Sequence, residues 1–186
     1  VYASVFGARG GAGDQVWVIN GAGNSFDRAI TADVAGLTGL ALDAANNRLF
    51  VTGLTNNEVA VIDLATDQVT ARWPSGGEGT INLVYDAGGD RLFVANQGTG
   101  TLTVLNAATG ELLRSVETGA GALGVNHDPV LGRIYVSNRQ AGTVSVVDSR
   151  TYAVIANLET GTFPQTIAID HASHTVYVTN KARGLP

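Results

Sequence analysis

The sequence predicts an all-β protein built from repeated four-stranded units, and three observations support this prediction. Four similar segments recur with starts 43, 42 and 42 residues apart, at 48–51 (RLFV), 91–94 (RLFV), 133–136 (RIYV) and 175–178 (TVYV). Between them, short runs alternate apolar and polar residues and end in Gly, Asn or Asp, which is typical of strands and turns. No stretch carries a helical period. A four-stranded unit repeated about every 42 residues is the pattern of a β-propeller of antiparallel blades.

The first strand of each repeat is short and apolar, and it ends in an aspartate. We expect it to be the innermost strand of a blade, because neighbouring blades cover that strand and it therefore needs apolar residues. A carboxylate before a turn accepts hydrogen bonds from backbone N–H groups, so the aspartates are expected to start the chain reversal. These predicted strands are residues 39–43, 82–86, 124–128 and 166–170.

The recurring segment is the second strand of each repeat, and two further strands follow it. The third alternates apolar and polar residues at 58–63, 101–106 and 143–148, and the fourth lies near 112–116 or 153–158. This order of short strands and turns predicts an antiparallel meander. We therefore expect one propeller segment over residues 1–186, a little over four blades, consisting of a partial blade (1–38), three blades (39–81, 82–123 and 124–165) and a second partial blade (166–186).

The composition excludes several classes of protein. The chain has 186 residues, of which 45% are hydrophobic and 15% charged, which is too apolar for a disordered protein. Absence of cysteine excludes disulfides, thiolate zinc sites and cysteine nucleophiles. A net charge of −5 with a single lysine makes nucleic-acid binding an unfavoured function. No apolar run approaches the roughly 18 to 20 residues of a membrane span. A chain without methionine is expected to be a trimmed or partial product, and no signal peptide is seen at Val1.

The second strands carry a resemblance to a known family. The segment 176–180 reads VYVTN, and 134–138 (IYVSN) and 92–96 (LFVAN) are close variants. This motif resembles the repeat of the YVTN-repeat β-propellers, also called YncE-like, and the resemblance covers nearly the whole chain. Two copies depart from the motif, since Gly53 and Val5 stand where the other copies have asparagine.

The resemblance implies a ring of about seven blades, often exported to the periplasm or cell surface, in which the defining repeat is structural. It implies no catalytic motif and no cofactor, so the expected function is a non-catalytic binding or interaction module. Relatives of similar architecture include lactonases and quinoprotein subunits. The alternative is therefore a propeller enzyme, either a metal-assisted lactonase-like hydrolase or a subunit of a quinone-linked dehydrogenase.

The open ends of a partial ring predict a partner. A chain of little more than four blades leaves two blade faces and strand edges uncovered, which is a liability for a soluble protein. We expect the remainder of the propeller ring to cover them, from the same precursor or from a separate chain. A four-bladed ring closed by its own ends is the alternative.

Candidate binding residues are sought where the repeats differ. In a propeller, the loops between second and third strands share one face with the links between blades, and variable loops on rigid strands often bind ligands. These loops contain four basic residues that could contact an anionic ligand or an acidic protein partner, although solvated loop cations are the simpler interpretation. The candidates are Arg9, Arg139, Lys181 and Arg183.

Three asparagines close the second strands at equivalent positions, at Asn96, Asn138 and Asn180. They are further ligand-binding candidates, but an asparagine at such a position more often bonds the loop backbone.

The remaining polar residues are given structural roles. The arginines that start the second strands (Arg48, Arg91 and Arg133) are expected to be surface residues. His127 replaces a bulky apolar residue of the other repeats, and His171 and His174 lie in a turn on the face opposite the loops. A third metal ligand is not evident, so no metal site is predicted. Neither a nucleophile elbow nor a Ser–His–Asp arrangement is present, and no catalytic residue is predicted.

Overall fold

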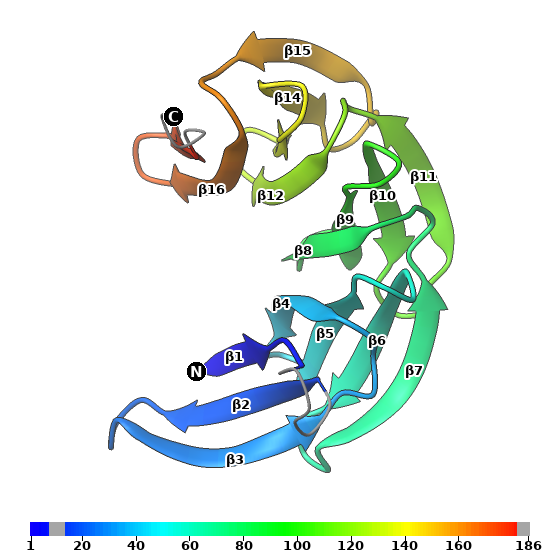
Figure 1. Ribbon diagram of the computed structural model, residues 1–186, viewed down its shortest axis with the longest axis vertical. Coiled ribbons are helices and arrows are strands. Elements are labelled where there is room, and N and C mark those ends of the chain that lie inside the picture. Colours follow the sequence, from blue (N-terminus) through cyan, green and yellow to red (C-terminus); the bar gives the residue numbers. More distant parts are fainter. Residues whose placement is uncertain (8–13, 182–186) are drawn as a thin grey trace, which may run out of the picture.

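A computed structural model describes residues 1–7 and 14–181. In that part of the chain, seventeen strands form five antiparallel sheets and no helix occurs, as predicted. We number the sheets blades 1 to 5 in chain order. Figure 1 shows them fanned around an open arc, with β4, β8, β12 and β16 on the inner side and β7, β11 and β15 on the outer side. The described residues include no helix long and apolar enough to cross a membrane.

Blades 2, 3 and 4 are complete meanders, and blades 1 and 5 are partial. Blade 1 contains β1 (Tyr2–Val5), β2 (Gln15–Asn20) and β3 (Ser25–Thr31). Blade 2 contains β4 (Leu37–Asp43), β5 (Arg48–Gly53), β6 (Glu58–Asp63) and β7 (Gln68–Pro74). Blade 3 contains β8 (Thr80–Asp86), β9 (Arg91–Asn96), β10 (Thr101–Asn106) and β11 (Leu112–Glu117). Blade 4 contains β12 (Ala122–Asp128), β13 (Arg133–Asn138), β14 (Thr143–Asp148) and β15 (Val154–Glu159), and blade 5 contains β16 (Pro164–Asp170) and β17 (Thr175–Asn180).

The hydrophobic core lies between the blades. The second strand of each complete blade contributes side chains to the apolar clusters on both faces of its sheet. In β5, Leu49 and Val51 pack in the cluster shared with blade 1, whereas Phe50 packs in the cluster shared with blade 3. Successive side chains of a strand point to opposite faces, so an uninterrupted apolar segment fits a sheet that is covered on both sides. Burial of each such side chain stabilises the fold by about 1.5–3 kcal/mol. Tyr177, which occupies the position of Phe50 in blade 5, is 59% exposed, since the described part of the chain places no further blade against it.

The aspartates that end the inner strands hold the turns that follow, which confirms the structural role predicted for them. Asp128 accepts hydrogen bonds from the backbone N–H groups of Val130 (3.0 Å) and Leu131 (3.1 Å). Asp86 accepts one from Gly88 (3.2 Å). We call the end of the blades that carries these turns the turn end, and the opposite end, with the links between blades, the loop end.

The prediction that the arginines starting the second strands are surface residues is wrong for Arg48 and Arg91. Arg48 is 21% exposed in its side chain, and it bonds the Asp43 carboxylate (2.9 and 2.7 Å) of its own blade. Its third contact reaches the next blade, where Nη1 donates to the Ala107 carbonyl oxygen at 2.7 Å. The arginine therefore joins two blades, a contact between residues 59 positions apart that the repeat pattern does not reveal.

Arg91 repeats this arrangement one blade later. It bonds the carboxylate of Asp86 (3.1 and 2.5 Å), and its Nη1 donates to the carbonyl oxygen of Ser149 (2.7 Å) and to the hydroxyl of Tyr152 (2.9 Å) in blade 4. Arg133 turns instead to Asp148 (2.7 Å) of its own blade. Blade 5, as described, has no third and fourth strands, so Arg133 has no corresponding carbonyl to reach.

Two hydroxyl groups link inner strands of adjacent blades. Thr52 Oγ1 accepts from the backbone of Gly39 (2.7 Å) and donates to the Ile81 carbonyl (3.2 Å) of blade 3. Ser137 makes the same pair of bonds between Gly124 (2.8 Å) and the carbonyl of Gln165 in blade 5 (2.6 Å). These bonds satisfy buried backbone groups where the inner strands meet.

We expect the variant Arg48→Ala to be less stable than the wild type by about 3 kcal/mol at pH 7, because it leaves a carboxylate that is 2% exposed without its partner. Burial by itself would raise the pKa of Asp43, but hydrogen bonds from Asn46 and Arg48 outweigh it and hold the pKa below its usual value. The stabilisation is therefore complete above the ordinary pKa of about 3.9 and is lost as the pH falls through the folded-state value.

Urea unfolding at pH 7 and pH 3 measures the loss of stability and its pH dependence. The difference in free energy of unfolding between wild type and variant should be smaller at pH 3. Arg114→Ala, on the exposed outer strand β11, is the control and should change stability by less than about 0.5 kcal/mol. An equal loss in the two variants would contradict the assigned role of Arg48.

Candidate functional site

The loop end is closed by a backbone pairing that recurs between each loop and the link beside it. Arg139 N donates to the Gly121 carbonyl at 2.8 Å, and Gln97 N donates to the Gly79 carbonyl at 2.9 Å. Lys181 N donates to the Phe163 carbonyl at 3.1 Å. The loops that were predicted to carry the binding residues are therefore fixed at their base to the preceding link.

The candidate asparagines Asn96 and Asn138 lie under these links and are fully buried. Asn96 Oδ1 accepts from Thr80 Oγ1 at 2.9 Å, and its Nδ2 donates to Thr103 Oγ1 at 3.0 Å. Asn138 Nδ2 donates to Ser145 Oγ at 2.8 Å. Both amides thus hold the loop to the blade, and only Asn180, in partial blade 5, is exposed.

Each of these asparagines packs against a link glycine three residues before the inner strand begins. A Cβ on Gly77 would lie 2.5 Å from Asn96 Cγ, and a Cβ on Gly119 would lie 2.9 Å from Asn138 Cγ. Blade 2 has the reverse arrangement, because a Cβ on Gly53, which replaces the asparagine, would lie 3.2 Å from the Cβ of Val34 in the link. One side of each contact carries the side chain and the other side is a glycine.

Blade 4 departs from blade 3 in one buried hydrogen bond. Asn138 Oδ1 is buried and has no partner. In blade 3 the equivalent oxygen is satisfied by Thr80, but the residue paired with Asn138 is Ala122, which has no hydroxyl. The missing donor explains the unsatisfied oxygen.

Two predicted basic residues are brought together around one aromatic ring. The Arg139 guanidinium lies over the ring of Phe163, 5.3 Å from its centre, and Lys181 bonds the backbone of the same residue. Within residues 14–181 the guanidinium of Arg139 has no ion-pair partner, and its Nε is buried without a hydrogen bond. Lys181 is exposed. The other two basic candidates, Arg9 and Arg183, lie outside the described residues.

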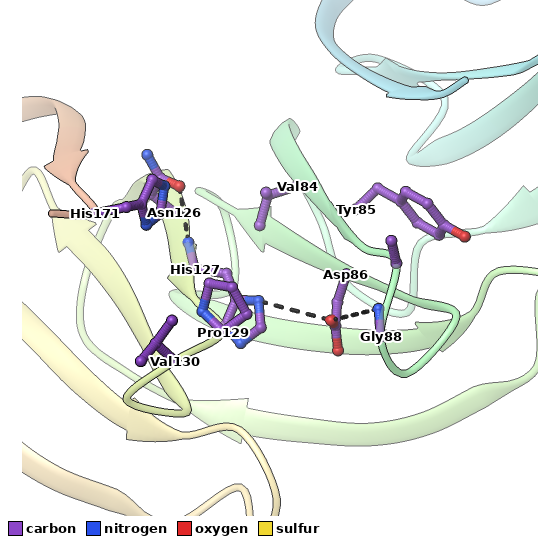
Figure 2. A pocket seen from close by; sticks show the side chains of 10 residues that line it. Val84, Tyr85, Asp86, Gly88, Asn126, His127, Pro129, Val130 and His171 are labelled. Atoms are coloured by element: carbon purple, nitrogen blue, oxygen red, sulfur yellow. Dashed lines mark hydrogen bonds and ion pairs between the residues drawn. The ribbon is translucent and has the colours of Figure 1, made fainter. Parts of the chain in front are cut away.

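A second region, at the turn end, was not among the predicted sites. A cavity of about 400 Å³ lies between the first hairpins of blades 3 and 4. Its wall is largely apolar, with a few polar groups, as is usual for small-molecule sites. It is lined by Val84, Tyr85, Asp86, Ala87, Gly88, Asn126, His127, Pro129, Val130 and His171 (Figure 2). A second hollow of about 320 Å³ shares Asp86, Gly88, His127, Pro129 and Val130 with it.

His127 is the central polar residue of this cavity and is 7% exposed. Its ring packs edge-on against Phe93 at 5.0 Å between centres, and its Nδ1 faces Asp86 Oδ1 at 3.9 Å (Figure 2). The other ring nitrogen, Nε2, is buried without a partner. Burial lowers the pKa of His127 despite the attraction of Asp86, so the imidazole is neutral at pH 7.

The other two histidines lie at the same end. His174 Nδ1 lies 2.6 Å from Oδ2 of the fully buried Asp128, which joins blade 5 to blade 4. Burial by itself would raise the pKa of Asp128, but hydrogen bonds from the turn backbone and from His174 outweigh it and hold the pKa below its usual value. His171 lines the cavity. Among the described residues no group of three or more His, Asp or Glu side chains is arranged to hold a metal ion.

The sequence contained one signal for this site that was interpreted as structural. His127 stands where the other blades have Leu42, Tyr85 and Ile169. Its contact with Asp86 could not be foreseen, because the two residues belong to different blades.

Comparisons with known proteins support the fold. The chain matches no family model and no curated protein. Among solved structures it is similar to hydrazine synthase of Kuenenia stuttgartiensis, with a TM-score of 0.75 and 16% identity over 84% of this chain and 45% of that one. It is also similar to the Cps50 (Swd1) β-propeller domain of Myceliophteria thermophila, with a TM-score of 0.71 and 9% identity over 90% of this chain and 56% of that one. The computationally designed Ika4 protein gives a TM-score of 0.64 and 16% identity over 80% of this chain and 92% of that one.

These similarities confirm the β-propeller fold and, at such identities, carry the fold alone. The chain spans about half the length of the two natural proteins, at 45% and 56%. Membership of the YVTN-repeat family stays a prediction.

We expect the variant Ala122→Thr to stabilise the protein by about 1 kcal/mol, because the new hydroxyl can donate to Asn138 Oδ1 as Thr80 does to Asn96. The reciprocal variant Thr80→Ala should destabilise by a similar amount. Thermal unfolding should show shifts of about 2–4 °C in opposite directions for a chain of this size. A loss of stability in both variants would show that a donor for Asn138 Oδ1 does not increase the free energy of unfolding.

We expect the variant His127→Leu, which copies Leu42 of blade 2, to be more stable than the wild type in mild acid. The unfolded chain binds a proton at the ordinary histidine pKa of about 6.5, whereas the folded imidazole resists it, so wild-type stability falls as the pH drops below that value. The charged groups that act on His127 are Asp86, Arg91, Asp128 and His171.

Urea unfolding at pH 8 and pH 5 gives the free energy of unfolding of both proteins. The difference in favour of the variant should increase by on the order of 1 kcal/mol from pH 8 to pH 5. The control is Arg114→Ala, on the exposed outer strand β11, which should show no such increase. An advantage that shrinks in acid would mean that the folded protein holds His127 in its charged form.

Proposed function

We propose that this chain is part of a non-catalytic propeller binding module that contacts an anionic ligand or an acidic protein partner through the loop end of blades 4 and 5. The contacting residues are Arg139 and Lys181, with Asn180 beside them. Arg9 and Arg183 are included as candidates from the sequence.

One observation carries the proposal, namely that the Arg139 guanidinium lies over the ring of Phe163, whose backbone carbonyl accepts a hydrogen bond from Lys181 N. The Phe163 ring restricts the position of the Arg139 guanidinium, and its Nη groups could donate charge-assisted hydrogen bonds to a carboxylate or phosphate. The flexible ammonium of Lys181 adds a second positive charge on the next loop. A protein with a net charge of −5 gains local attraction for anions only where such cations gather.

The proposal extends to the remainder of the ring. The arc is open, the outward face of blade 5 exposes Tyr177, and Arg133 lacks the next-blade carbonyl that Arg48 and Arg91 bond. Further blades, from the same precursor or a separate chain, would cover these groups, and the YVTN-like repeats favour a ring of about seven blades. The same resemblance supports export to the periplasm or the cell surface.

A propeller enzyme is the second candidate, and the pair His174–Asp128 favours it. A buried carboxylate 2.6 Å from a histidine nitrogen is the arrangement that orients a general base. A divalent ion retained at the inner strands would indicate a lactonase-like hydrolase. A cofactor visible in the absorption spectrum would indicate a subunit of a quinone-linked dehydrogenase.

We expect charge reversal in the double variant Arg139→Glu/Lys181→Glu to weaken binding of anions at the loop end at least tenfold. The probes are inorganic phosphate and a polyglutamate peptide, whose relative affinities distinguish a small anion from an acidic partner. Isothermal titration at low salt gives both dissociation constants, and 0.5 M salt should raise both of them, because screening weakens the attraction between the cations and the anion.

The control is Arg114→Glu, which changes the net charge by the same amount per residue on the outer strand β11. If the double variant binds both probes as tightly as the wild type, or if neither probe binds the wild type, Arg139 and Lys181 are not the contact residues.

A further inference from the structure

We propose that the cavity between blades 3 and 4 at the turn end binds a small, mainly apolar molecule that carries a hydroxyl group, of the size and class of a phenol. This site is independent of the loop end, and nothing in the proposed function requires it.

The shape and lining of the cavity set the body of the ligand. A volume of about 400 Å³ exceeds that of a single ring, and the side chains of Val84, Pro129 and Val130 provide an apolar wall. Val130 is 73% exposed, so much of its side chain remains open to contact with a ligand. A planar apolar body in the cavity would cover part of that surface.

Two buried polar groups set the functional group of the ligand. His127 Nδ1 and Asp86 Oδ1 face one another across the cavity at 3.9 Å, which is too long for a hydrogen bond (Figure 2). Both side chains are more than nine-tenths buried, at 7% and 5% exposure. A single ligand oxygen can bridge this gap if it makes a hydrogen bond of about 2.8 Å to each group, with the two bonds meeting at the oxygen near a right angle.

The group that completes this gap must both accept and donate. Attraction to the carboxylate favours the tautomer with the proton on Nδ1, so the nitrogen donates and the carboxylate oxygen accepts. A hydroxyl is the smallest group that can accept from one and donate to the other. An ether oxygen can only accept, so it would add nothing to Asp86 Oδ1, which would keep only its hydrogen bond from Gly88 N (3.2 Å).

The neighbouring polar groups do not compete for this role. The Tyr85 hydroxyl donates to Asp90 at 3.0 Å, and burial together with that bond raises the pKa of Tyr85 to about 12. The other oxygen of Asp86 is held by Arg91. Among the blades only blade 4 has a histidine at this position, where the sister blades have Leu42, Tyr85 and Ile169, so the site occurs once in the sequence.

The test is a titration of ¹⁵N-histidine-labelled protein with phenol and, in parallel, with anisole, which has the same ring but an ether oxygen. The chain has three histidines, so each imidazole is followed separately by NMR. Phenol should shift the His127 resonances in a saturable way, with a dissociation constant on the order of 1 mM, while His174 shifts little. Anisole should bind at least tenfold more weakly.

The variant His127→Leu should lose at least tenfold in phenol affinity, measured by ligand-observed NMR, and unchanged His174 resonances would show that it remains folded. Arg114→Ala, far from the cavity, should bind phenol as the wild type does. The proposal is overturned if phenol and anisole bind equally, if His127→Leu retains phenol, or if His127 shows no saturable shift up to the solubility limit. None of these outcomes bears on anion binding at the loop end.

Discussion

Every blade of this protein depends on being covered on both sides. The second strand places Leu49 and Val51 against one neighbour and Phe50 against the other, and β9 in blade 3 does the same with Leu92 and Phe93. A single sheet of this kind would leave half of its apolar residues in water, so it is stable only within a row of blades. The exposed Tyr177 of blade 5 shows what the same position looks like without a neighbour.

Apolar packing alone would allow adjacent blades to slide, and directional bonds fix their relative position. Arg48 and Arg91 each bind a buried aspartate of their own blade and a backbone carbonyl of the next. The hydroxyls of Thr52 and Ser137 join inner strands in a similar way. Arg91 joins blades 3 and 4 beside Asp86, and its bonds fix the position of the Asp86 carboxylate relative to blade 4, as a preorganised site requires.

The periodic part of the structure was predictable and the contacts between periods were not. The strands, the blade meander and the aspartate turns follow from residues that are close in sequence. Arg48 was taken for a surface residue because its carbonyl partner belongs to the next blade. The meeting of His127 with Asp86 follows from residues of different blades in the same way, whereas the contact of Arg139 with Phe163 joins a loop to a link 24 residues later within one predicted repeat. For Asn96 the sequence left two roles open, ligand binding or bonding within the loop. The glycine that packs against it lies in the preceding repeat, so the sequence pattern does not decide between them.

The contact between link and loop constrains how such repeats can evolve. In the pairs Gly77 with Asn96 and Gly119 with Asn138, a Cβ on the glycine would overlap the asparagine side chain, and in blade 2 the side chain stands on the link side, with Val34 facing Gly53. A side chain added at the glycine alone would overlap the asparagine, so this change is favoured only after the asparagine has become smaller. The pair also crosses the strand-defined boundary between repeats, since the glycine precedes the inner strand by three residues. A gene duplication that begins at the inner strand would separate the members, whereas one that begins before the link glycine would inherit the pair as a unit.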